Sequence, residues 1–112
     1  MSTKDFPDRD IYVRDKCTCQ YCGMSATDDF DKYRHLCIDH IMPLSMGGGV
    51  DDANKVVACR RCNEFLGDFR PDDAHRDKRI QLKRDKVAER NAAEYKDYQS
   101  LQLEIMFGGS AA

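Results

Sequence analysis

The sequence has 112 residues, enough for one domain with an appendage. It is 41% hydrophobic and 34% charged, and it has no apolar run of the roughly 18 residues that a membrane-spanning helix needs, so no membrane association is expected. Its net charge of −2 disfavours a simple basic DNA-binding protein. The N-terminus lacks the apolar segment of a signal peptide, so we expect a cytoplasmic protein whose six cysteines are thiols or metal ligands rather than disulfides.

Composition divides the chain into four segments. Residues 1–11 mix acids and bases and are predicted to form a flexible leader. Residues 12–71 are dense in Cys, Gly, His and Asn and are predicted to form the folded domain. Residues 72–107 consist mostly of good helix formers, opened by two aspartates that can cap a helix, and are predicted to be a charged helical extension. Residues 108–112 are predicted to be a flexible tail.

The domain segment predicts a small α+β fold. Tyr33–Ile41 has the alternating pattern of a strand, which Pro43 ends because proline lacks a backbone N–H. Residues 45–54 contain three consecutive glycines and are expected to be an irregular loop. Residues 55–58 are predicted as the returning strand, and a short helix is expected from residue 60 or 61 to about 69.

The extension carries a thin apolar stripe at helical intervals, which includes Tyr95, Tyr98, Leu101 and Ile105. A single helix over this segment would be about 50 Å long, so we expect it either to break once or to project beyond the core. The stripe is expected to pack on the core or on a partner, which makes a homodimer or a protein partner through this helix an expectation.

Two Cys-x-x-Cys pairs, Cys19/Cys22 and Cys59/Cys62, supply the four thiolates of a tetrahedral zinc site. The segment between them is 36 residues long, more than the usual spacing of a zinc ribbon, which indicates an insertion between the two turns. Cys17 offers a competing but poorer Cys-x-Cys pairing, and Cys37 is expected to be a small core residue.

Polar residues inside this insertion and just after it suggest catalysis. Asp39 offers a carboxylate and Asn63 an amide oxygen, the oxygen ligands that Mg²⁺ prefers. Histidine titrates near neutral pH, so His40 is the natural general base. Neighbouring strand residues point to opposite sides, so Asp39 and His40 need a local bend to serve one site.

At this point the sequence resembles the zinc-knuckle HNH endonucleases of the ββα-metal superfamily. The matching residues are Cys19-x-x-Cys22-Gly23, Ile38-Asp39-His40-Ile41-x-Pro43-Leu44-Ser45-x-Gly47-Gly48, Asn54 and Cys59-x-x-Cys62-Asn63, with Arg14-Asp15 before them and Gly67-Asp68 after them. The resemblance covers residues 12–71.

The resemblance implies two strands and a helix around a catalytic metal, stapled by structural Zn²⁺. It implies that His40 activates water, that Asp39 and Asn63 bind one catalytic Mg²⁺ or Mn²⁺, and that Asn54 holds the loop and orients His40. Family members cut DNA to leave 5′-phosphate and 3′-hydroxyl ends, contacting it mainly through the backbone.

DNA binding is less clearly encoded. Glu64-Phe65-Leu66-Gly67 stands where many family members carry basic residues, and seven lysines and arginines against three acids fall within residues 76–90. They predict either phosphate contacts or a solvated helix face. The candidate DNA contacts are Arg60, Arg61, Arg70, His35, Arg76, Arg79 and Lys83. The alternative to a nuclease is a catalytically inactive zinc-knuckle module that binds DNA or a protein.

Overall fold

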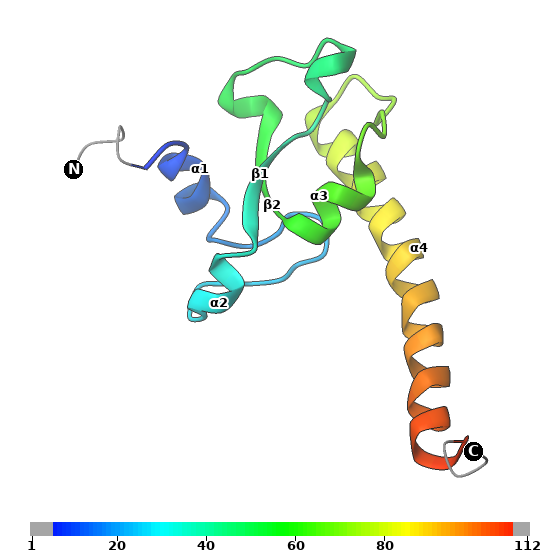
Figure 1. The fold of residues 1–112 in the computed structure, drawn as a ribbon. Coiled ribbons are helices and arrows are strands. Elements are labelled where there is room, and N and C mark those ends of the chain that lie inside the picture. Colours follow the sequence, from blue (N-terminus) through cyan, green and yellow to red (C-terminus); the bar gives the residue numbers. More distant parts are fainter. Residues whose placement is uncertain (1–5, 109–112) are drawn as a thin grey trace.

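A small sheet, four α-helices and short 3-10 and π-helical turns make up the computed structural model, which describes residues 6–108 (Figure 1). The α-helices and strands are α1 (Arg9–Arg14), α2 (Phe30–Tyr33), β1 (Leu36–His40), β2 (Lys55–Cys59), α3 (Arg60–Leu66) and α4 (Arg76–Leu103). A π-helical turn, Glu104–Gly108, follows α4. Within the described range no helix is long and apolar enough to cross a membrane. The architecture is the predicted small α+β fold with a C-terminal helix.

The core is built around the antiparallel pair β1–β2, whose register runs from Leu36 opposite Cys59 to His40 opposite Lys55. Residues 56–58 of β2 are completely buried. A two-stranded sheet is marginally stable alone, so it needs covering elements. In this protein α1, α3 and the first half of α4 supply them, with Ile11, Leu66, Ile80 and Val87 in one apolar cluster with the sheet.

The segment Arg14-Asp15 ties the N-terminal helix to β2. The Arg14 guanidinium donates to the Lys55 carbonyl at 2.6 Å, and the Asp15 carboxylate accepts from the Val57 N–H at 2.9 Å. These bonds satisfy the outer edge of β2, which has no third strand beside it in the described structure. The two charged residues are therefore part of the fold.

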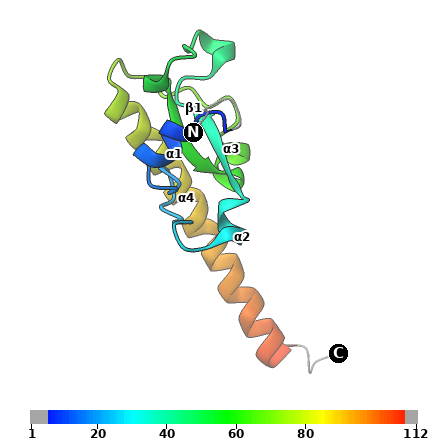
Figure 2. The ribbon, with the colours of Figure 1, turned by 90° about the vertical axis from the view of Figure 1, so that its left-hand side faces the viewer.

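Helix α4 is continuous and projects beyond the core, one of the two expected outcomes (Figures 1 and 2). The radius of gyration is 17.2 Å, against about 13 Å for a compact domain of this length. Tyr98 and Leu101 are 56% and 55% exposed, so this end of the apolar stripe does not pack on the core, which was the first of its two expected positions. A partner on this end of the helix stays a prediction.

Several predicted boundaries shift. Helix α1 begins at Arg9 and buries Ile11, inside the segment predicted to be a flexible leader. The chain before β1 forms the short helix α2, because the Asp29 carboxylate caps it by accepting from the Lys32 N–H at 3.0 Å. Residues 1–5 of the leader and 109–112 of the tail lie outside the described residues.

The two later helices also differ at their ends. Helix α3 stops at Leu66, short of the predicted residue 69, because Gly67 adopts a positive φ of 47° that terminates it. Helix α4 begins at Arg76 rather than at Asp72, since Asp73 uses its carboxylate to accept from the His75 N–H just before the helix. Because Ile80 and Val87 belong to the core, the first part of the predicted extension is packed into the folded unit.

Candidate active site and cysteine cluster

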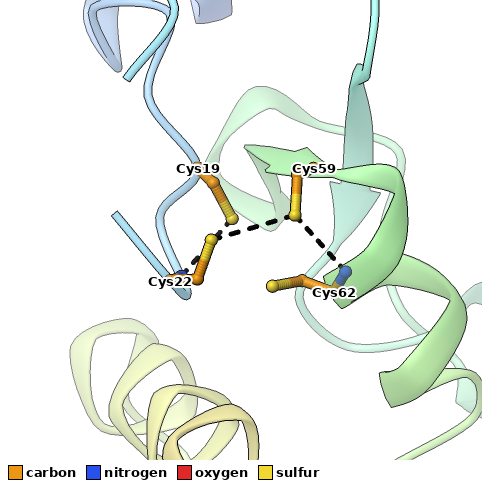
Figure 3. Close-up of side chains that lie close together, drawn as sticks. All are labelled: Cys19, Cys22, Cys59 and Cys62. Atoms are coloured by element: carbon orange, nitrogen blue, oxygen red, sulfur yellow. Dashed lines mark hydrogen bonds between the residues drawn. The ribbon is translucent and has the colours of Figure 1, made fainter. Parts of the chain in front are cut away.

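The four cysteines of the two Cys-x-x-Cys pairs meet in one cluster, with all four sulfurs within 4.8 Å of one another (Figure 3). The Sγ atoms of Cys22 and Cys59 are 3.8 Å apart. Sulfurs bound to one tetrahedral zinc at about 2.3 Å would lie about 3.8 Å apart, so the cluster fits this ion. Cys17 and Cys37 lie outside the cluster, as expected.

Each pair forms the same turn, in which the second cysteine donates its backbone N–H to the first sulfur. The distances are 3.4 Å from Cys22 N to Cys19 Sγ and 3.4 Å from Cys62 N to Cys59 Sγ. Hydrogen bonds from the Cys22 and Cys62 thiols lower the pKa of Cys19. This shift favours the thiolate form of Cys19, which is the form that binds a metal.

A pocket of about 280 Å³ opens at the end of β1 and brings Asp39, His40 and Asn63 together. Asp39 and His40 come from β1, and Asn63 comes from α3 directly after the second cysteine pair. Asp68 also lines the pocket. The cysteine cluster fixes the start of α3 against the strands, and so it fixes Asn63 opposite Asp39.

Asp39 is 5% exposed, and its carboxylate accepts three hydrogen bonds from the described residues. Its Oδ1 accepts from Nδ2 of Asn63, which also lines the pocket, at 2.8 Å. Its Oδ2 accepts from the Tyr21 hydroxyl at 2.5 Å and from Lys83 Nζ at 2.8 Å. Burial, reinforced by the Asp39 charge, raises the pKa of Tyr21, so Tyr21 stays a donor at neutral pH.

His40 lines the same pocket and is half-buried. Its backbone carbonyl accepts from Lys83 Nζ at 3.0 Å. No group of residues 6–108 hydrogen-bonds its imidazole ring, which leaves the ring nitrogens available to water and substrate.

Asn54 closes the loop that leads from β1 to β2. Its Oδ1 accepts from the Met42 N–H at 2.9 Å, and its Nδ2 donates to the carbonyls of Met42 at 3.0 Å and Gly49 at 2.8 Å. Its own carbonyl accepts from the Ile41 N–H at 2.8 Å. These bonds hold the chain immediately after His40; that they orient the His40 ring stays a prediction.

Comparison with known proteins identifies the family of the chain. The family model of the HNH endonucleases matches residues 19–79, more than half of the chain. The chain belongs to the HNH endonuclease family. No curated protein and no solved structure matches it.

The sequence missed two residues of this HNH site, Tyr21 and Lys83. Tyr21 is hidden between the cysteines of the first pair, where its spacing gives no signal. Lys83 did give a sequence signal. It shares a helix face with the buried Ile80 and Val87, and this spacing indicates a core position. Its prediction as a DNA contact is wrong, because its side chain is 1% exposed and bound to Asp39.

The other predicted DNA contacts of the HNH domain have different surroundings. Arg61 pairs with Glu94 and donates to Asn91 Oδ1 at 2.7 Å, which joins α3 to α4. His35 and Arg60 line a second shallow pocket.

Arg70, Arg76 and Arg79 line a pocket of about 370 Å³ beside Gly47–Gly49. Arg76 and Arg79 each use Nε to bind a backbone carbonyl, of Ala53 at 2.8 Å and of Asp73 at 2.5 Å. This anchoring fixes the two guanidinium groups next to the loop that follows β1.

Proposed function

We propose that this protein is a metal-dependent DNA endonuclease that hydrolyses phosphodiester bonds with His40 as the general base. The observation that carries the proposal is the pocket that places Asp39, His40 and Asn63 together on an intact cysteine-stapled HNH fold. A purely structural zinc domain has no need of an available imidazole beside a buried carboxylate and an amide.

Asp39 and Asn63 are the residues that would hold the catalytic Mg²⁺ or Mn²⁺. The distance of 2.8 Å between Asp39 Oδ1 and Asn63 Nδ2 is close to the roughly 3.0 Å between neighbouring ligands of an octahedral Mg²⁺. Rotating the Asn63 amide by half a turn brings its oxygen to that position. When bound, such an ion supplies positive charge against the scissile phosphate and the departing 3′ oxygen.

His40 then acts on the attacking water. Its ring has no competing protein partner among residues 6–108, so a nitrogen is available to accept the water proton. Asn54, by fixing Met42 and Gly49, limits the movement of the chain that follows His40. The products expected from family chemistry are 5′-phosphate and 3′-hydroxyl ends.

DNA is held, in this proposal, mainly through its phosphates. Arg70, Arg76 and Arg79 are the best-placed cations, because they share one pocket beside the loop that follows His40. Arg60 and His35 offer a second contact region. Such contacts weaken steeply as salt rises.

Plasmid nicking by the zinc-loaded protein tests the proposal. His40→Ala should lower the cleavage rate with Mg²⁺ or Mn²⁺ at least about a hundredfold, the usual scale for loss of a general base. His75→Ala is the matched control, since His75 is exposed and lies outside the catalytic pocket; it should cleave at nearly the native rate.

Equal cutting by native protein and His40→Ala would point to a contaminating nuclease and overturn the enzymatic role. Native protein that shifts DNA in a gel but never cuts it would favour the alternative, a catalytically inactive zinc-knuckle module.

A further inference from the structure

Lys83 is the most deeply buried charged side chain of residues 6–108, at 1% exposure. Its Nζ lies 2.8 Å from Asp39 Oδ2 and 3.0 Å from the His40 carbonyl, and 5.4 Å from the centre of the Tyr21 ring. Lysine is almost never fully buried unless it is paired, because removing its charge from water is costly. The contacts here go to both members of the Asp39-His40 pair.

We propose that Lys83 is a positioning residue of the active site: an internal cation, contributed by α4, that orients the Asp39 carboxylate and fixes the backbone of His40. This proposal rests on the proposed function, because the nuclease activity is what gives Asp39 and His40 catalytic roles. Lys83 lies beyond residues 19–79, where the match to the HNH family ends, so the role belongs to this chain's own C-terminal helix.

The division of the Asp39 oxygens supports this role. Lys83 and Tyr21 both occupy Oδ2, which leaves Oδ1 directed toward Asn63 and the pocket. Groups that bind the outer oxygen of a ligating carboxylate fix the direction of its inner oxygen. Lys83 thereby selects which oxygen faces the site.

The charge of Lys83 has a second consequence. With no other ion present, the ammonium group compensates the buried carboxylate, so the site can form before a metal binds. The same positive charge opposes a divalent cation at Oδ1. Removing it should therefore strengthen metal binding, whereas the loss of orientation should slow cleavage.

Lys83→Met keeps the approximate length of the side chain but removes its charge, so it tests whether metal affinity rises while the cleavage rate falls. We expect Mn²⁺ to bind at least about fivefold more tightly in an electron paramagnetic resonance titration without DNA, because a nearby like charge is gone. At saturating Mn²⁺ we expect cleavage to be at least about tenfold slower. Lys78 is an exposed lysine of the same helix, and Lys78→Met should match the native protein in both measurements.

If Lys83→Met behaves like Lys78→Met, the proposal is overturned. It is also overturned if Mn²⁺ binding and cleavage both weaken, because that result indicates structural damage alone. Metal binding is measured without DNA and therefore does not depend on cleavage. Native protein that binds Mn²⁺ but never cuts DNA would refute the proposed function. The comparison of Mn²⁺ binding between the two variants would still test the role of Lys83.

If Lys83→Met fails to fold, nitrogen-15 nuclear magnetic resonance of the native protein tests the role of Lys83 instead. The Lys83 ammonium signal, identified through its Hε–Nζ correlation, should be protected from solvent exchange at neutral pH and should shift on addition of Mg²⁺. An unprotected signal, or one that Mg²⁺ leaves in place, would refute the role.

Discussion

At the scale of single residues, Gly48 shows how closely the loop after β1 packs onto the strand end. A Cβ added there would lie 1.9 Å from the Met42 carbonyl oxygen and 2.9 Å from Asn54 Nδ2. Neither atom can move freely, because each is part of the hydrogen bonds that Asn54 makes. A side chain at this position would disrupt the hydrogen bonds by which Asn54 holds the chain after His40.

Gly48→Ala should therefore destabilise the protein by about 1–3 kcal/mol, the scale of overpacking, and lower the cleavage rate as well. Gly49→Ala is the control, because its added Cβ meets only the rotatable carboxylate of Asp51 and the neighbouring backbone at 4.0 Å. Urea unfolding of the two variants checks the prediction. Equal stability would mean that the loop yields at both positions.

At the scale of elements, the cysteine cluster joins the turn before α2 to the junction of β2 and α3. Short elements of this kind bury little apolar surface, so a bound zinc would supply much of their stability. The junction carries Asn63, so damage to the cluster should also disturb the pocket that Asn63 shares with Asp39 and His40.

Cys59→Ser should lower the free energy of unfolding by at least about 3 kcal/mol, because it removes a zinc ligand. Cys37→Ser is the matched control: it lies outside the cluster, and burial raises the pKa of Cys37 to about 11, which keeps its thiol neutral. Its effect should be about 1 kcal/mol or less. Thermal melting with and without a zinc chelator provides the measurement, and a native melting curve after verified zinc removal would contradict a structural zinc.

At the scale of the whole molecule, α4 has two parts with different roles. Residues 76–94 bury Ile80, Lys83 and Val87 and are held to α3 by Arg61, which contacts Asn91 and Glu94. Residues 95–103 are exposed and extend into solvent (Figure 2). A helix end without tertiary contacts contributes little to stability in water.

Removing residues 97–112 should therefore shift the melting temperature by no more than about 3 °C. Removing residues 80–112 should prevent folding, because it takes away two core side chains, each contributing about 1.5–3 kcal/mol of burial, and the partner of Asp39. Circular dichroism melts of both truncations check this. Large destabilisation by the shorter deletion would indicate that the deleted end of α4 packs on the rest of the protein.

The sequence by itself determined the features that depend on residue type and spacing. Four thiolates in two Cys-x-x-Cys turns can meet at one metal whatever lies between them, and the cluster is confirmed. The strand pair and α3 followed from β-branched residues, Pro43 and Gly67. The candidate catalytic residues were named from their types and from the resemblance of the sequence to a family, and the family is confirmed.

Only the tertiary structure decided which polar groups meet across the core. Lys83 is 44 positions from Asp39, and helical periodicity places it on a face without saying what that face covers. Packing α4 against the sheet turned a predicted DNA contact into the buried partner of Asp39. The same packing left Tyr98 and Leu101 in solvent, because the helix is longer than the core it covers.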